Sequence, residues 1–201
     1  MSILEYDKTI ILENDYVKLS PLKEKHSNDL LEISNESSIW KYLLEKGNGL
    51  KNLTNYIQTA IKNRELKREY PFIVFDKINN KYAGTTRFYD YSEQLKSIKL
   101  GHTWYGELFR GTGLNKHCKY LLLEYTFEKL KLERIGFGVH QENKVSLAAL
   151  KSIGCKEEGK LRNFIASVDN KGRTAIVLLN IVKDEWHNIK LQLIQQLNRK
   201  T

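Results

Sequence analysis

The chain of 201 residues is 41% hydrophobic and 10% aromatic, enough for one folded core, which argues against intrinsic disorder. Its net charge of +9 comes from 33 basic and 24 acidic residues mixed along the chain, which favours anionic ligands but not nucleic acid in particular. The first ten residues lack a signal-peptide pattern, and no apolar run approaches the roughly 20 residues of a membrane-spanning helix. We expect one cytoplasmic domain over residues 1–201, without membrane association.

The first half of the chain predicts a strand, three helices and a hairpin. Residues 10–19 form the expected strand, and Ser20-Pro21 ends it. Apolar residues at helical spacing then predict helices around residues 30–33, 39–44 and 50–61, with a glycine-containing break at 47–49. From Pro71 the pattern becomes β-rich, so residues 72–75 and 82–91 should pair around a turn at 79–81.

The second half predicts the rest of a mixed sheet. Residues 95–105 should add an antiparallel strand, and residues 134–140 should lie parallel beside it, because a helix beginning near Leu114 connects the two. A short helix at 143–152, strands at 156–166 and 174–181 around a turn at 169–172, and a final amphipathic helix carrying Trp186 follow. The predicted fold class is therefore α+β, with a central, mostly antiparallel twisted sheet flanked by helices.

The turn between residues 109 and 115 is the candidate binding site. Gly111 and Gly113 permit positive φ and close backbone approach, and the next helix directs its free N–H groups and positive dipole end at the loop. This arrangement favours an anion, above all phosphate, although a tight connection without a ligand would also explain it. The two cysteines, Cys118 and Cys155, fall in different predicted elements and indicate buried thiols, with neither a metal cluster nor a disulfide.

Three segments carry a resemblance to a known family. Arg110-x-x-Gly113-x-Asn115 resembles the pyrophosphate loop Q/R-x-x-G-x-G/A of the GNAT superfamily of acetyl-CoA-dependent N-acetyltransferases, with Asn115 in place of the usual small residue. Asn143 and Ser146 match its N-x-x-S motif, and residues 156–163 are similar to the E-G-x-L-R segment of the ribosomal-protein N-acetyltransferase-like branch. Without the resemblance, Asn143 would be interpreted as an ordinary helix cap.

The resemblance implies the GNAT fold over nearly the whole chain and acetyl-CoA as co-substrate, with no metal. The helices of the first half then resemble the substrate-side lid of that fold. The implied cofactor-binding residues are Trp104, Tyr105, Arg110, Gly111, Thr112, Gly113, Leu114, Asn115 and Asn143.

Acetyl transfer to an amine also needs acid–base groups. A protonated amine must lose a proton before it attacks the thioester, and the resulting oxyanion is best stabilised by a fixed backbone N–H, which we assign to residues 103–105. The acidic position common in the family is Lys99 here, so His102, with an ordinary pKa near ~6.5, is the candidate base. Strand alternation would place His102 on the face of Leu100 and Trp104, where a purely structural role is the alternative. By resemblance, Ser146 is the candidate donor to the leaving thiolate.

The acceptor stays open between a protein N-terminus and a small-molecule amine. A non-catalytic CoA-binding regulatory or RNA- or ribosome-associated domain is the alternative function, because Lys99 replaces the usual acid. Turnover of acetyl-CoA with a panel of amines would separate the two. We expect no nucleic-acid partner and either a monomer or a homodimer.

Overall fold

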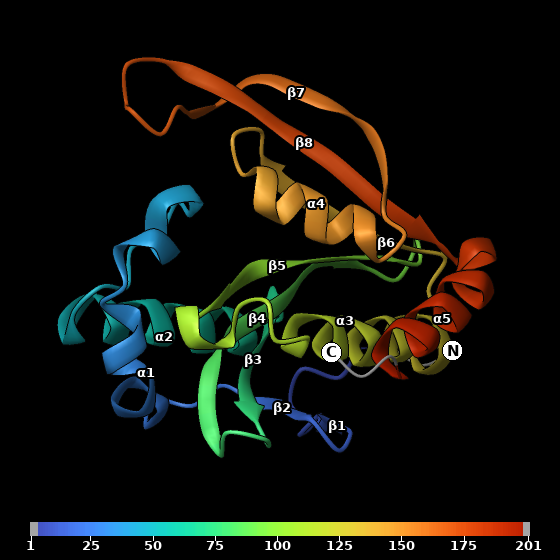
Figure 1. Ribbon diagram of the computed structural model, residues 1–201, viewed down its shortest axis with the longest axis horizontal. Helices are drawn as coiled ribbons and strands as arrows, with labels where there is room; N and C mark the ends of the chain where they lie inside the picture. Colours follow the sequence, from blue (N-terminus) through green and yellow to red (C-terminus); the bar gives the residue numbers. More distant parts are fainter. Residues whose placement is uncertain (1–3, 199–201) are drawn as a thin grey trace.

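The computed structural model describes residues 4–198, so residues 1–3 and 199–201, the two ends of the expected domain, lie outside the described residues. Its strands form one eight-stranded sheet in the order β1-β2-β3-β4-β5-β6-β8-β7 (Figure 1). The strands are β1 (Leu12–Glu13), β2 (Val17–Pro21), β3 (Glu69–Asp76), β4 (Lys81–Ser92), β5 (Ser97–Tyr105), β6 (Arg134–His140), β7 (Lys156–Ala166) and β8 (Arg173–Val182). The helices are α1 (His26–Ser34), η1 (Ser37–Tyr42), α2 (Leu50–Glu65), η2 (Glu107–Phe109), α3 (Leu114–Glu124), η3 (Tyr125–Lys129), α4 (Lys144–Ser152) and α5 (Lys183–Asn198).

The expected mixed sheet is confirmed. Strands β5 and β6 run parallel, whereas every other neighbouring pair is antiparallel. The prediction of one strand over residues 10–19 was wrong, because a turn divides this segment into β1 and β2. The Asn14 side-chain oxygen accepts hydrogen bonds from the backbone N–H groups of Tyr16 and Val17, each at 3.0 Å, and this local turn competes with continued strand pairing.

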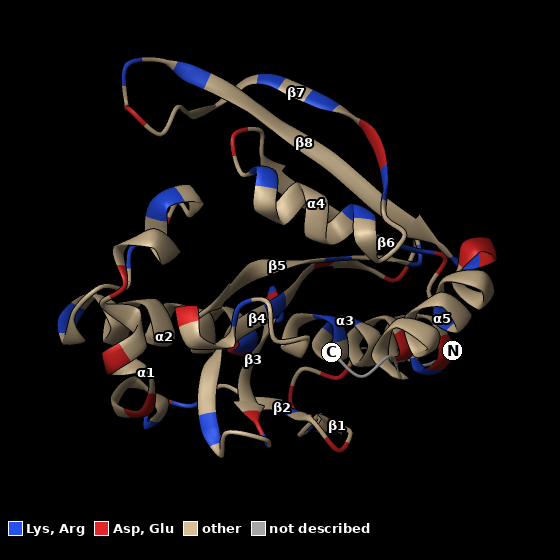
Figure 2. Cartoon of the chain, viewed as in Figure 1, with Lys and Arg blue, Asp and Glu red and all other residues tan. Residues whose placement is uncertain are grey.

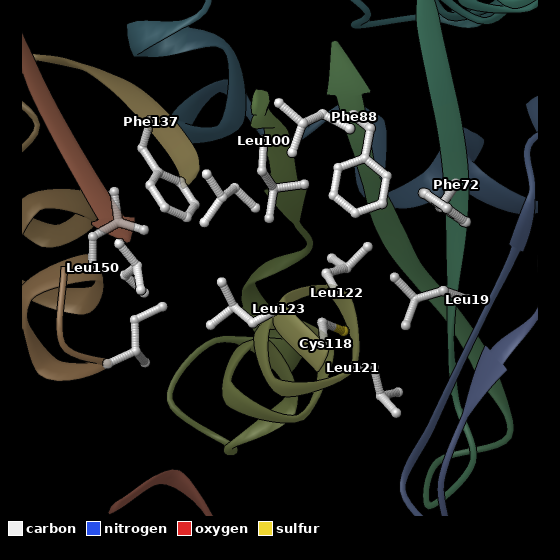
Figure 3. Packing of buried hydrophobic residues seen from close by; sticks show 14 of the residues in the cluster. Leu19, Phe72, Phe88, Leu100, Cys118, Leu121, Leu122, Leu123, Phe137 and Leu150 are labelled. Atoms are coloured by element: carbon white, nitrogen blue, oxygen red, sulfur yellow. The ribbon is translucent and has the colours of Figure 1, made fainter. Parts of the chain in front are cut away.

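Helices cover both faces of the sheet. One apolar cluster joins α3, α4 and α5 to the strands, and Figure 3 shows Cys118 and Leu121 to Leu123 of α3 among Leu19, Phe72, Phe88, Leu100 and Phe137. A second cluster packs α1, η1 and α2 on the opposite side, against Ile73 and Trp104. The helix expected around residues 39–44 is a 3-10 helix ending at Tyr42, fixed by a 2.7 Å hydrogen bond from Trp40 Nε1 to the Ser34 carbonyl.

Basic and acidic residues are interleaved along most elements rather than gathered in one large patch, as Figure 2 shows for one view. This distribution agrees with the mixed charges of the sequence. Within residues 4–198, no helix combines the length and apolar character needed to cross a membrane.

Candidate functional site

The sheet opens into a wedge between β5 and β6. These parallel strands pair only from Ser97 to Lys99 on β5 and from Arg134 to Gly136 on β6. Beyond that point β5 continues along β4 to Tyr105, whereas β6 continues along β8 to His140. Since each strand keeps its outer partner, their facing edges separate, and backbone groups on those edges become free to bind a ligand.

The loop after β5 presents further free N–H groups. Gly111 and Gly113 have φ of 76° and 88°, and Gly113 is the N-cap residue of α3. Within the described part of the chain, no hydrogen-bond acceptor meets the backbone N–H of Gly111, Gly113 or Asn115. A Cβ added at either glycine would have no atom within 4 Å, so the space in front of these N–H groups is open. Such a cluster at a helix N-terminus suits a phosphate group.

Tyr105 and Trp104 contribute differently to the wedge. The Gly106 N–H donates to the Ala83 carbonyl of β4 at 3.0 Å. Because successive N–H groups of a strand point to opposite edges, the N–H of Tyr105 points away from β4 and toward the wedge. The Trp104 side chain instead points into the cluster of α1 and α2, where its Nε1 donates to Tyr56 Oη at 3.2 Å. Trp104 is thus placed as a core side chain.

Arg110 fastens the loop to its surroundings. Its Nε donates to the Tyr105 carbonyl at 2.9 Å, its Nη1 donates to Ser38 Oγ at 3.0 Å, and its Nη2 lies 3.7 Å from Glu36. Thr112 Oγ1 donates to the Phe109 carbonyl at 2.9 Å. These bonds hold the loop in position, so the backbone rather than the arginine head faces the open space.

A β-bulge places His102. The register of β4 and β5 shifts between Thr85 and Arg87, opposite His102, whose φ is 49°. The inserted residue puts Leu100 and Trp104 in opposite apolar clusters, so the expectation that they share a face with His102 was wrong. His102 belongs to neither cluster, and its side chain is 31% exposed.

The surroundings of His102 favour a neutral imidazole. Its Nδ1 lies 3.9 Å from Glu45 Oε2, and its ring meets Tyr89 edge-on at 5.5 Å. Burial, assisted by the nearby Arg87 guanidinium, lowers the pKa of His102 below 6.5. The buried Arg87 in turn lies 3.0 Å from Glu69 and 3.4 Å from Glu45. The imidazole is therefore unprotonated at neutral pH and able to accept a proton.

The other candidates have separate places. Lys99, at the position of the family's acid, lies 3.0 Å from Asp90 on the exposed surface. Asn143 caps α4 by accepting from Ser146 N–H at 3.1 Å, as an ordinary cap would. Ser146 lies in the first turn of α4, which follows the separated end of β6, and is partly exposed.

A model of the acetyltransferase (GNAT) domain matches residues 17–156, well over half of the chain. The chain belongs to the GNAT acetyltransferase family. It is thus an acetyl-CoA-dependent acyltransferase. The Bacillus subtilis protein named "Putative ribosomal N-acetyltransferase YdaF" is 25% identical over 183 residues, covering 88% of this chain and 97% of the relative.

Solved GNAT structures share the architecture. A GCN5-related N-acetyltransferase from Brucella melitensis superposes with a TM-score of 0.88 at 22% identity, covering 99% of this chain and 90% of that one. Mycobacterium smegmatis RimJ, solved in complex with CoA-disulfide, gives a TM-score of 0.76 at 19% identity, covering 94% and 93% of the two chains. These likenesses confirm the GNAT fold.

Sequence reasoning missed the charged neighbours of His102 in this GNAT chain. Glu45 follows η1, Glu69 begins β3 and Arg87 lies within β4, so nothing local in the sequence associates them with residue 102. The arginine inside the otherwise apolar and threonine-rich stretch of residues 83–88 was the one available signal, because a buried guanidinium needs acidic partners.

Proposed function

We propose that this protein transfers the acetyl group of acetyl-CoA directly to a primary amine, with His102 as general base. The observation that carries the proposal is the arrangement of a neutral, partly exposed His102 at the bulge of the same strand that ends in the loop of free N–H groups. One strand thereby links a phosphate-binding end to a proton-accepting end.

The free N–H groups of Gly111, Gly113 and Asn115 would hold the diphosphate of CoA. From there the pantetheine arm would follow the free edge of β5, where Tyr105 N–H is available, toward His102. The CoA-disulfide in the complex of the RimJ relative supports CoA as the ligand of this fold. Asn115 donates through its backbone, so its larger side chain does not prevent this contact.

His102 would remove the amine proton. Its Nδ1 faces Glu45, which leaves Nε2 to accept a proton from the attacking nitrogen. Glu45, 37% exposed, would also attract a cationic amine before it loses its proton, and orient the imidazole. A backbone N–H of residues 103–105 would stabilise the oxyanion, and Ser146 would donate to the departing thiolate, whose pKa resembles the ~8.5 of cysteine.

The acceptor we propose is a protein N-terminus or a small-molecule amine. An α-amino group titrates near ~7.7–8.0, so a neutral imidazole can deprotonate it at neutral pH. The name of the YdaF relative, a ribosomal N-acetyltransferase, supports including N-terminal peptides of ribosomal proteins in the acceptor panel.

The test measures CoA binding and acetyl transfer separately. CoA at 100 times its Kd should stabilise the protein by about 2.7 kcal/mol. His102→Gln should keep this thermal shift but lower kcat roughly 10²-fold or more, whereas His187→Gln, a control at an exposed position on α5, should change neither. The acidic limb of the kcat/KM profile should have an apparent pKa below 6.5 and disappear in His102→Gln.

Unchanged turnover and pH profile in His102→Gln would remove the histidine from the mechanism. Tight CoA binding without transfer to any amine in the panel would instead favour a non-catalytic CoA-binding domain. Absence of any thermal shift with saturating CoA would contradict the assignment of the loop.

A further inference from the structure

Lys119 is a buried cation that the mechanism above does not use. It lies in α3 with 4% of its surface exposed, and apart from His117 the other buried side chains of this helix are apolar. A buried ammonium loses its hydration, and a protein keeps it only where hydrogen-bond acceptors or opposite charges compensate. The contacts of Lys119 therefore need an explanation.

The ammonium sits beneath the wedge. Lys119 Nζ donates to Thr103 Oγ1 of β5 at 3.3 Å and lies 5.8 Å from the centre of the Phe137 ring of β6. Thr103 follows His102 in the bulge, and Phe137 follows Gly136, where the pairing of β5 with β6 ends. Lys119 thus contacts one residue from each separating strand, beyond the last paired residues Lys99 and Gly136.

The ammonium has donor capacity to spare. Among the described residues, Thr103 Oγ1 is the one hydrogen-bond acceptor that meets Nζ, whereas an ammonium carries three protons. No carboxylate of the described residues pairs with it. Burial lowers the pKa of Lys119 to about 8, so it remains mostly protonated at pH 7.

We propose that Lys119 Nζ donates a hydrogen bond to the thioester carbonyl oxygen of bound acetyl-CoA and stabilises the oxyanion formed during transfer. This inference rests on the proposed function. His102 first takes a proton from the ammonium, and the free amine nitrogen then forms a bond to the carbonyl carbon while the carbonyl electron pair moves to the oxygen beside Lys119. When that pair returns, the C–S bond breaks, the CoA thiolate leaves, and the second proton of the attacking nitrogen goes to the thiolate.

The position of Lys119 along α3 favours the thioester over the diphosphate. The helix begins at Leu114, so at 1.5 Å per residue Lys119 lies about 7 Å further along the axis than the N-terminal groups proposed for phosphate. Its hydrogen bond to Thr103 holds it against the residue that follows His102 in β5. A fixed cation near a developing oxyanion acts strongly because no solvent has to reorganise around it.

The test compares Lys119→Met with Lys129→Met, an exposed lysine at the end of the same helical segment. Methionine keeps the length of the side chain and suits a buried position, so the fold should survive. Thr103→Val, which removes the hydroxyl that positions Nζ, is a second, independent variant. For each protein, infrared spectroscopy of acetyl-CoA labelled with ¹³C at the carbonyl reports the hydrogen bond directly, and the Kd values of CoA and acetyl-CoA are measured in parallel.

In the parent and in Lys129→Met, the thioester carbonyl stretch should shift to lower wavenumber on binding. In Lys119→Met the shift should be lost, kcat with the best acceptor should fall roughly 10²- to 10³-fold, and the Kd of CoA should be unchanged. Thr103→Val should also reduce the shift and lower kcat, but by less than Lys119→Met does.

An unchanged stretch and unchanged kcat in Lys119→Met would overturn the inference while leaving the proposed function intact. If Lys119→Met weakens the binding of CoA and of acetyl-CoA equally and leaves the carbonyl stretch unchanged, Lys119 contacts an amide carbonyl of pantetheine instead. That result would also overturn the inference. A parent that fails to bind CoA at all would instead refute the proposed function and with it this inference.

Discussion

Replacing Gly113 by alanine tests whether the open loop is a phosphate site, and Gly49→Ala is a matched control. Both glycines are N-cap residues of helices, with φ of 88° and 78°, and a Cβ at either would have no atom within 4 Å. Neither substitution causes a clash, so the cost in each is backbone strain. For Gly113, in the left-handed helical region with ψ of −17°, the strain is about 1–2 kcal/mol. Gly49, with ψ of 154°, lies in a region almost restricted to glycine, so Gly49→Ala should lose at least as much stability as Gly113→Ala.

Their affinities for CoA should differ. A Cβ at Gly113 occupies the space that a phosphate oxygen needs to reach the backbone N–H groups, whereas Gly49 lies before α2, outside the proposed phosphate site. Loss of one charge-assisted hydrogen bond of about 1.5–3 kcal/mol corresponds to roughly 10- to 100-fold weaker binding. Urea denaturation measures the stability of each variant, and calorimetric titration measures the Kd of CoA.

If folded Gly113→Ala binds CoA as tightly as the parent, the glycine is only a turn residue and the loop is not the phosphate site. If both variants weaken CoA binding equally, backbone strain rather than occupied space explains the loss.

Two further predictions concern stability. Lys119 has a pKa of about 8 in the folded protein against an ordinary 10.5, so between these values the unfolded chain holds a proton that the folded chain has released. Between pH 8 and pH 10.5, the free energy of unfolding of the parent should accordingly rise by up to about 3 kcal/mol relative to that of Lys119→Met. Urea denaturation at several pH values measures both free energies. If they change with pH in the same way, the charge of Lys119 is not buried as described. Burial raises the pKa of the neighbouring Cys118 and Cys155 thiols to about 12 in the folded protein, and their titration in the unfolded chain is common to the parent and Lys119→Met, so it cancels in the comparison. Gly84→Ala should destabilise the protein by about 2–4 kcal/mol, because the added Cβ would lie 2.0 Å from the Trp104 carbonyl oxygen. In the control Gly159→Ala the added Cβ would have no atom within 4 Å, so the free energy of unfolding should change by no more than about 0.5 kcal/mol. Equal denaturation midpoints of the two variants would refute the close approach of β4 and β5.

Much of the fold and of the loop before α3 can be predicted from short stretches of the sequence. Two glycines before an amphipathic helix predict a free N–H cluster because backbone freedom and helix polarity are properties of a few consecutive residues. The order of strands and helices likewise predicts the parallel pairing of β5 with β6, since a helix must connect them. The motif alone predicts that Trp104 contacts the cofactor, because a motif does not reveal the face to which a side chain points.

Only the tertiary structure decided which groups surround His102, the proposed base. The bulge at His102 shifts the strand by one residue and reverses the faces of those that follow, and no local pattern in residues 97–105 predicts it. Glu45, from the segment after η1, and Lys119, from α3, lie near this part of β5, and Glu45 is far from residue 102 in the sequence. The sequence by itself determines the glycine loop proposed to bind phosphate, because neighbouring residues act together there. The charges that set the pKa of His102, and the position of the Lys119 ammonium, depend on distances across the sheet, which exist only after packing.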